Sequence, residues 1–155
     1  SPLPSYSEPF ESPYQTPDLY KEYDLCLTTG ARDYAFYHSA WTNIAHQRIL
    51  EPWPYIEINE DDARERQISE GEWLWVETRR GKIKAKARVS KGVIKGAASM
   101  CRPNYKHACK ELNLPGFSWD KGNPNILTTA EGSDPGFGAA PMRSLLCKVT
   151  KVNEL

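Results

Sequence analysis

The sequence lacks a charge excess of either sign. Its 155 residues contain 20 lysines and arginines and 20 aspartates and glutamates, so the formal net charge is zero. Proteins that bind nucleic acids or membrane surfaces usually carry a basic surface, so this balance predicts no nucleic-acid partner, although it allows a local basic patch. No apolar run approaches the about 18 residues of a membrane-spanning helix, and no secretory signal core is present. We therefore expect one globular domain without a membrane span.

Cysteine is scarce and is not arranged as a scaffold. The four cysteines, at positions 26, 101, 109 and 147, form no CxxC pair. The absence of a disulfide pattern favours a reducing compartment such as the cytoplasm. Cys101 and Cys109 flank His107, but a metal site there needs a fourth ligand and tighter spacing, so we expect an ordinary loop, with a disulfide as the lesser alternative. Cys26 and Cys147 lie in apolar runs and are predicted to be small buried side chains.

Proline is concentrated at the start of the sequence. Residues 1–20, SPLPSYSEPFESPYQTPDLY, contain five prolines and three tyrosines. Proline blocks helix interiors and central strands, so this segment is predicted to be an extended arm. The arm is either a linker from an upstream segment or a strap across the domain surface. Since the sequence begins with Ser1 and not with methionine, we expect a fragment or a processed product.

Short runs typical of strands recur along the remaining chain. The predicted strands are 24–28, 55–58, 72–78, 82–89, 97–100 and 144–152, with a further strand end at 125–129. One helix is expected near 39–45. Another follows Asn59 as N-cap, with three carboxylates in its first turn. Several short strands with few helices and long loops predict a β-rich domain, most simply a closed barrel.

The alternation of residues in 72–78 and 82–89 predicts which face of each strand is buried. Trp73, Trp75 and Glu77 share one face of the first strand, opposite Leu74 and Val76. In the second strand, apolar residues alternate with a basic stripe. That stripe is made of Lys82, Lys84, Lys86 and Arg88. The stripe could bind phosphate, but a solvated face of a half-buried antiparallel strand explains it more simply.

Two loops have similar beginnings. LTTGA at 27–31 and LTTAEG at 127–132 each end a predicted strand with Leu-Thr-Thr and lead into a long polar segment. A duplicated strand–loop unit suits a barrel with approximate two-fold symmetry, and two such loops on one side would grip a single extended ligand. Coincidence is the alternative, because the similarity is short.

The first of these loops has the chemistry to bind a phosphate or a heterocycle. The hydroxyls of Thr28 and Thr29 and free backbone N–H groups at a strand end can bind either. Gly30 permits a positive φ and close approach of the backbone. Arg32 can bind a phosphate with two hydrogen bonds. Asn43, and Asn125 near the second loop, can pair with the edges of purines or pterins.

The ordered set of motifs resembles the C-terminal dinucleotide-binding domain of the molybdopterin oxidoreductases, the dimethyl sulfoxide reductase family. The resemblance covers about residues 24–152. It is carried by LTTGARDYAFYHSAWTN, PYIEINEDDARERQISEGEWLWVETRRGKIKAKARVS, KGVIKGAASM, NPNILTTAEGSDPGFGAAP and SLLCKVTKV. It implies a six-stranded double-psi β-barrel with a pseudo-two-fold axis over residues 24–155, preceded by a linker over residues 1–23.

The resemblance also implies a cofactor and the residues that contact it. The cofactor is molybdenum or tungsten carried by two molybdopterin guanine dinucleotides, and the barrel caps it. The implied cofactor-binding residues are Thr28, Thr29, Gly30 and Arg32 on one dinucleotide, His38, Ser39 and Asn43 near the pterin, and Asn125, Thr128 and Asp134 from the other side. In the family the Thr-Gly-Arg triplet is often contiguous, whereas here Ala31 separates Gly30 from Arg32.

His38 is the one candidate here for proton chemistry near the pterin. A hydrogen bond to the cofactor is the favoured role, and a structural role is the other alternative. The iron–sulfur cysteines and the metal ligand of the family belong to upstream domains, and nothing in this sequence resembles them.

We therefore expect a cofactor-binding fragment without turnover of its own, from a molybdopterin-dependent oxidoreductase. Its partners are the upstream domains of the same polypeptide and, as a further candidate, an iron–sulfur electron-transfer subunit. Two alternatives stay open. The parent protein could be a hydratase or transhydroxylase of the same family, which does no net redox chemistry. The barrel could also be a stand-alone adaptor that uses its arm and exposed tryptophans to bind other proteins.

Overall fold

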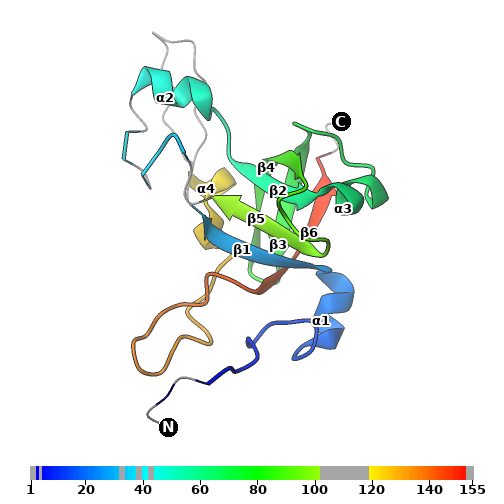
Figure 1. Ribbon diagram of the computed structural model, residues 1–155, viewed down its shortest axis with the longest axis vertical. Helices are drawn as coiled ribbons and strands as arrows, with labels where there is room; N and C mark the ends of the chain where they lie inside the picture. Colours follow the sequence, from blue (N-terminus) through cyan, green and yellow to red (C-terminus); the bar gives the residue numbers. More distant parts are fainter. Residues whose placement is uncertain are drawn as a thin grey trace.

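The computed structural model describes Leu3 and residues 5–31, 34–37, 40–41, 44–101 and 119–152. Its centre is a closed barrel of six strands in the order β1-β5-β2-β4-β3-β6 (Figure 1). The strands are β1 (Leu25–Ala31), β2 (Tyr55–Asn59), β3 (Trp73–Thr78), β4 (Gly81–Ser90), β5 (Ala97–Cys101) and β6 (Leu145–Lys151). The described helices are α1 (Pro17–Glu22), α2 (Ala45–Leu50), α3 (Glu60–Glu65), α4 (Trp119–Gly122) and the 3-10 helix η2 (Pro124–Ile126).

The barrel has an internal two-fold relationship. Exchanging β1 with β4, β2 with β5 and β3 with β6 maps the closed strand order onto itself. The exchange also turns the parallel pair β1–β5 into the parallel pair β4–β2, while the other four pairs are antiparallel. The first three strands are therefore the counterpart of the last three. This arrangement confirms the expected double-psi β-barrel with a pseudo-two-fold axis.

The core is built by the alternation that the sequence showed. Leu74 of β3 lies opposite Ala85 of β4, and Val76 lies opposite Ile83. All four side chains are fully buried, and apolar burial contributes about 25 cal/mol per Å² removed from water. The alternate residues of both strands, including Trp75, face outward and are half-buried or exposed. The predicted faces of both strands are confirmed.

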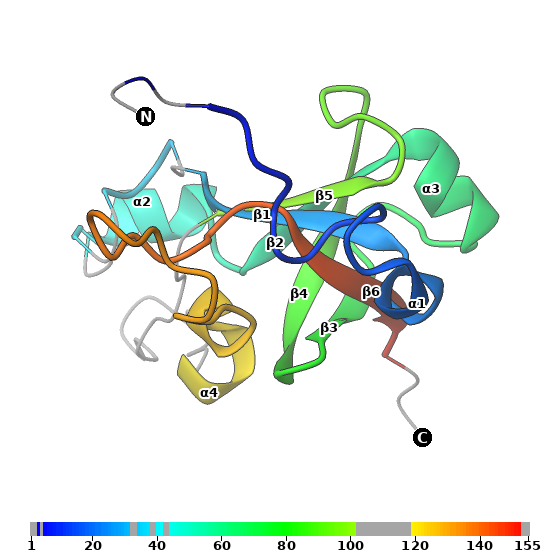
Figure 2. The same ribbon diagram turned by 90° about the horizontal axis from the view of Figure 1, so that it is seen from below.

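The long connections gather at one end of the barrel. β1 and β5 run parallel and finish there, while β2 and β6, antiparallel to them, begin there. The connections 32–54 and 102–144 therefore both leave and return at this end, which we call the loop end. In Figures 1 and 2, α2 on the first connection and the orange segment 131–140 on the second both lie to the left of the barrel, with α2 above and the orange segment below in Figure 1.

The strand end predicted at residues 125–129 is wrong. Pro124–Ile126 form a 3-10 helix, and a turn follows it. The side chain of Asn123 accepts a hydrogen bond from the N–H of Asn125, and Pro124 sits in the first turn, where its missing N–H costs nothing. The two Leu-Thr-Thr segments are therefore not a duplicated strand–loop unit, because the two-fold relationship pairs β1 with β4. Both do lead into connections at the loop end.

The extended arm contains one helix that the sequence reading missed. Proline was taken there as a helix breaker, but α1 begins at Pro17, a position that tolerates proline. Asp18 lies in its first turn and Lys21 in its last, as the helix dipole favours. The helix predicted near residues 39–45 is displaced: α2 covers Ala45–Leu50. The helix predicted after Asn59 is confirmed, since the Asn59 side chain accepts from the N–H of Asp61 at 2.8 Å.

Candidate functional site

The end of β1 carries three of the predicted site residues. Gly30 has φ +91°, a positive φ of the kind that glycine permits. It forms a bulge against β5, because Thr29 pairs with Met100 and Ala31 with Cys101, which leaves Gly30 without a partner in the register. The bulge absorbs one extra residue, so β1 stays paired up to Ala31.

The two threonines of β1 have different environments. Thr29 is buried, and both its hydroxyl and its backbone N–H donate to the carbonyl of Met142 at 2.8 Å. Thr28 is half-buried and points to the opposite face of the strand. Thr29 thus ties β1 to the segment before β6, whereas the Thr28 hydroxyl has no hydrogen-bond partner within the described part of the chain.

The second predicted loop is anchored to the barrel at its start. The hydroxyl of Thr78, at the end of β3, donates to the carbonyl of Leu127 at 3.1 Å, and Leu127 is fully buried. Asn125 is exposed, and the hydroxyl of Thr128 donates to its carbonyl at 3.2 Å. The Thr128 hydroxyl therefore lies beside the backbone of Asn125, within the same turn of the second connection.

Asp134 organises the turn that carries it. One carboxylate oxygen accepts from the N–H groups of Gly136 at 2.9 Å and Phe137 at 2.7 Å. The backbone of Asp134 also exchanges hydrogen bonds with Gly138 and Ala139. Asp134 as a whole is exposed. Asp134 therefore holds the loop in shape and still presents an acceptor at its surface.

Four of the predicted site residues lie outside the described residues: Arg32, His38, Ser39 and Asn43. The same holds for Cys109 and His107, so the loop and disulfide alternatives for the second cysteine pair stay open. Of the ten predicted cofactor-binding residues, the structure brings Thr28, Thr29 and Gly30 together on β1, and Asn125, Thr128 and Asp134 together on the second connection.

Exposed aromatic residues lie on both long connections at the loop end, and none of them is among the ten residues that the sequence predicted for the site. Tyr34 and Phe137 are almost fully exposed, at 104% and 95%. Trp41, which lies 6.4 Å from the ring of Tyr37, is half exposed and has φ +68°. A bulky residue in the left-handed region is unusual, and exposed aromatics beside polar loops suit stacking or contact with another protein surface. Their aromatic character within polar, glycine-rich segments was the available signal.

The described residues fit a large polar ligand at the loop end. Besides Thr28 and Asn125, the side-chain oxygen of Gln47 on α2 is buried without a hydrogen-bond donor in the described part of the chain. A buried acceptor without a donor costs about 1–3 kcal/mol, so a donor from outside the described residues is expected there. Hydroxyl, amide and backbone groups from both long connections are the donor set that pterin and nucleotide edges require.

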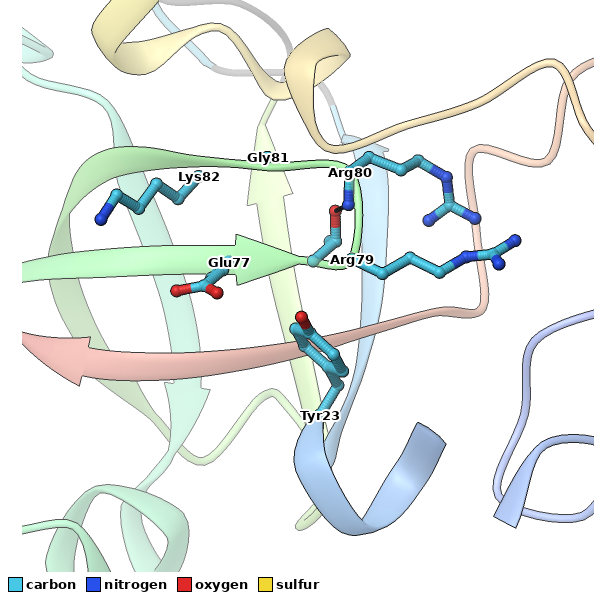
Figure 3. A pocket seen from close by; sticks show the side chains of 7 residues that line it. Tyr23, Glu77, Arg79, Arg80, Gly81 and Lys82 are labelled. Atoms are coloured by element: carbon cyan, nitrogen blue, oxygen red, sulfur yellow. Dashed lines mark hydrogen bonds between the residues drawn. The ribbon is translucent and has the colours of Figure 1, made fainter. Parts of the chain in front are cut away.

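A small open pocket lies beside the turn between β3 and β4 (Figure 3). Its volume is about 300 Å³, and it is lined by Tyr23, Glu77, Thr78, Arg79, Arg80, Gly81 and Lys82. Figure 3 shows the two arginine side chains extending together past the turn. They reach carboxylates of other segments, so this pocket has no excess of positive charge. Burial raises the pKa of Tyr23, whose ring lies under the ammonium group of Lys148.

The basic stripe of β4 lies on the outer face of the barrel, because the alternate residues of β4 are buried in the core. The ammonium groups of Lys82 and Lys84 lie 4.8 and 4.9 Å from the ring centre of Trp75. Lys86 lies over Trp53 and Trp73 at 5.2 and 5.3 Å. These cation–π contacts show that the stripe packs on the tryptophans of the barrel surface, as expected for a structural strand face.

The described residues offer no site for a metal held by protein side chains. Among them, no group of three or more His, Cys, Asp or Glu residues is arranged around a common point. Cys26 and Cys147 are free thiols. In the same part of the chain, none of the helices combines the length and the apolar character needed to cross a membrane.

The fold and site together define a class of protein: a double-psi barrel that presents two polar connections at one end to a large ligand. The comparison with family models identifies the family. Residues 25–145 match the molydopterin dinucleotide binding domain, and the chain belongs to this family. The match confirms the expected cofactor-binding domain and its cofactor, molybdopterin guanine dinucleotide with molybdenum or tungsten.

Known relatives include enzymes of several reactions. The chain is 34% identical over 151 residues, 96% of its length, to the dopamine dehydroxylase of Eggerthella lenta. It is 34% identical over 110 residues to the F420-dependent formate dehydrogenase subunit alpha of Methanocaldococcus jannaschii. The structure of the acetylene hydratase from Pelobacter acetylenicus covers 97% of the chain with a TM-score of 0.86 and 26% identity.

The chain is only a part of what these relatives contain. It spans 14% of the dopamine dehydroxylase and of the formate dehydrogenase subunit, and 21% of the acetylene hydratase chain. The sequence is thus the counterpart of one domain in a larger polypeptide.

Proposed function

We propose that the complete protein is a molybdenum- or tungsten-dependent oxidoreductase in which this barrel caps the cofactor through its loop end. The observation that carries the proposal is the meeting of two polar connections, one after β1 and one before β6, at the same end of a barrel of this family. The bound group would supply a metal that changes its oxidation state by two electrons. Among the described residues, no three His, Cys, Asp or Glu side chains are grouped so that they could hold a metal ion by themselves.

The described residues would bind and orient the organic part of the cofactor. Thr28 would donate its hydroxyl, and Gly30, which has no side chain and adopts φ +91°, would let the backbone approach the cofactor closely. Asn125 and Thr128 would bind the opposite side of the same group. Asp134 would act through the loop it shapes as well as through its own carboxylate.

Arg32, His38, Ser39 and Asn43 belong to the same proposal through the sequence alone. Arg32 would bind a phosphate, and His38 would donate or accept a hydrogen bond near the pterin. Outside this chain, the proposal includes the other domains of the same polypeptide and an iron–sulfur subunit that exchanges electrons with the metal.

Cofactor content of site variants tests the proposal. In the complete protein, Thr28→Ala and Asn125→Ala should each lower the amount of guanine nucleotide and pterin that stays with the protein after gel filtration. The matched controls are Thr150→Ala, an exposed threonine of β6, and Gln15→Ala, an exposed amide of the arm. Loss of about tenfold in affinity corresponds to about 1.4 kcal/mol, the size of one good hydrogen bond to a ligand. Equal retention in all four variants would contradict the proposed contacts.

A second candidate function is a hydration or transhydroxylation without net redox change. The observation that favours it is the match in fold to the acetylene hydratase over 97% of the chain. The two candidates differ in one measurement. The purified complete protein of an oxidoreductase exchanges electrons with a viologen dye when its substrate is present, whereas a hydratase turns over its substrate without changing the oxidation state of the dye.

A further inference from the structure

The N-terminal arm contributes a buried carboxylate to the loop end. Glu11 is 1% exposed, although glutamate is rarely buried without partners. One of its oxygens lies 2.7 Å from Nε of Arg79 and also pairs with Nη2 of Arg80. The other accepts from Nη1 of Arg80 and from the backbone N–H of Leu146, both at 3.3 Å. Glu11 thus joins the β3–β4 turn to the start of β6.

The same contacts reach the second connection. Arg79 bridges two carboxylates, because its Nη2 lies 2.6 Å from Glu131 while its Nε binds Glu11. Beside this bridge, the ring of Phe10 lies against Gly132, where an added Cβ would lie 2.6 Å from Cδ1 of Phe10. Gly132 has φ +74°, which favours glycine a second time. Two adjacent residues of the arm therefore hold two adjacent residues of the loop.

We propose that the arm is a latch that holds the cofactor loop in its binding geometry, with Glu11 and Phe10 as positioning residues. The latch consists of Phe10, Glu11, Arg79, Arg80, Glu131 and Gly132. It rests on the proposed function, since the loop it holds carries Thr128 and Asp134. The linker from the upstream segment is thereby coupled to the cofactor loop, so the domain can bind fully only when its arm is docked.

The electrostatics explain why the latch closes as a unit. A carboxylate removed from water is stabilised only when its oxygens are fully paired, and Glu11 obtains this from two guanidinium groups and one N–H. Arg80 is itself mostly buried and lies 5.7 Å from the ring of Phe10. Loss of one partner leaves charge uncompensated in a dry site, so the remaining contacts weaken together.

Hydrogen exchange of the complete protein, with its cofactor, tests the latch. Arg79→Gln cuts the bridge between Glu11 and Glu131 but leaves Arg80 on the buried carboxylate, so the fold should persist. We expect the amides of residues 128–138, among them Ser133 and Gly138, to exchange about tenfold faster than in the unmodified protein. Glu11→Gln should increase the exchange rate of the same amides by more than tenfold. In both variants, pterin should be released faster after dilution.

Two exposed charges serve as matched controls. Arg64→Gln and Asp18→Asn alter side chains that are 73% and 92% exposed and whose ion pairs, with Asp61 and Lys21, involve no residue of the latch. Both should leave the exchange of residues 128–138 unchanged. The latch is overturned if Arg79→Gln and Glu11→Gln change only the arm or the whole domain equally, without a selective effect on residues 128–138. A protein that contains no pterin would refute the proposed function. The latch would still be tested, because hydrogen exchange of residues 128–138 can be measured without the cofactor.

Discussion

Thr29 makes two hydrogen bonds to the backbone carbonyl of Met142, which is 113 positions away in the chain. The hydroxyl and the backbone N–H of Thr29 both donate to the Met142 oxygen, each at 2.8 Å. This pair of hydrogen bonds joins the end of β1 to the end of the second connection. The two connections that form the candidate site are therefore tied to each other through backbone as well as by the barrel.

Thr29→Val should loosen this junction. Valine has nearly the same shape but lacks the hydroxyl, and a hydrogen bond of this kind contributes about 1 kcal/mol. We expect the backbone amide of residue 29 to exchange about fivefold faster in the valine variant than in the unmodified protein, as that free energy implies. Thr29→Ser retains the hydroxyl and should stay close to the unmodified protein. Equal exchange in the valine and serine variants would show that the hydroxyl does not stabilise the junction.

Gly30→Ala should strain the bulge of β1. A left-handed conformation costs a residue with a Cβ about 1–2 kcal/mol, and Gly30 has φ +91°. We expect a lower thermal midpoint for the domain and weaker retention of the cofactor. Gly92→Ala is the control, since Gly92 has no positive φ and only the flexible Ser90 hydroxyl nearby, at 3.2 Å. A stable Gly30→Ala variant with full cofactor content would contradict the role given to the bulge.

Two substitutions of Asp134 distinguish its role in shaping the turn from a direct contact of its charge with the cofactor. Asp134→Ala removes the acceptor of the Gly136 and Phe137 N–H groups and should increase exchange at both amides. Asp134→Asn keeps an oxygen at this position and should preserve the turn. If the asparagine variant keeps the turn but loses cofactor, the charge contacts the ligand directly. If the alanine variant leaves both amides protected, the turn does not depend on this side chain.

Cys147 should resist alkylation in the folded protein. Burial raises the pKa of this thiol well above its usual range, and partial burial also raises the pKa of the Cys26 thiol. Because the thiolate is the reactive form, iodoacetamide should modify Cys147 at pH 8 only after urea has unfolded the domain. Modification in the native state at the rate of an unfolded thiol would contradict the burial of Cys147 in β6.

The same shift gives a pH dependence of stability. The folded pKa lies above the unfolded value of about 8.5, so the unfolded state loses its proton first as the pH rises. The contribution of Cys147 is complete below about pH 8.5 and falls by about 1.4 kcal/mol per pH unit above it. A short alkylation pulse at Cys147 measures the urea midpoint of this domain. The midpoint should decrease between pH 8.5 and 9.5, and Cys147 should contribute no change to it below pH 8.

The barrel was predictable because its signals are local. The alternation in β3 and β4 predicted the buried face of each strand, and the glycine at position 30 allowed the positive φ that the structure has. The strand end predicted at Leu127 failed for a local reason as well: the Asn123-Pro124 pair begins a 3-10 helix and overrides the strand preference of Leu-Thr-Thr.

The latch could not be predicted from sequence. Glu11 and Arg79 are far apart in the chain, and nothing in the composition of the arm shows that one of its carboxylates is buried. The sequence left a linker and a surface strap open for this proline-rich segment, because sequence patterns report local conformation and not the surface against which a segment docks. The same limit applies to Phe137, whose exposure depends on the turn that Asp134 forms.

The most direct test of the central claim is the cofactor content of the complete, purified protein. Molybdenum and tungsten are measured by elemental analysis, and an acid-treated, oxidised extract is examined for pterin fluorescence and for GMP. The domain family and the two polar connections at the loop end predict one of the two metals together with guanine-linked pterin. A fully assembled protein that contains neither metal nor pterin would contradict the account and would leave the barrel as an adaptor.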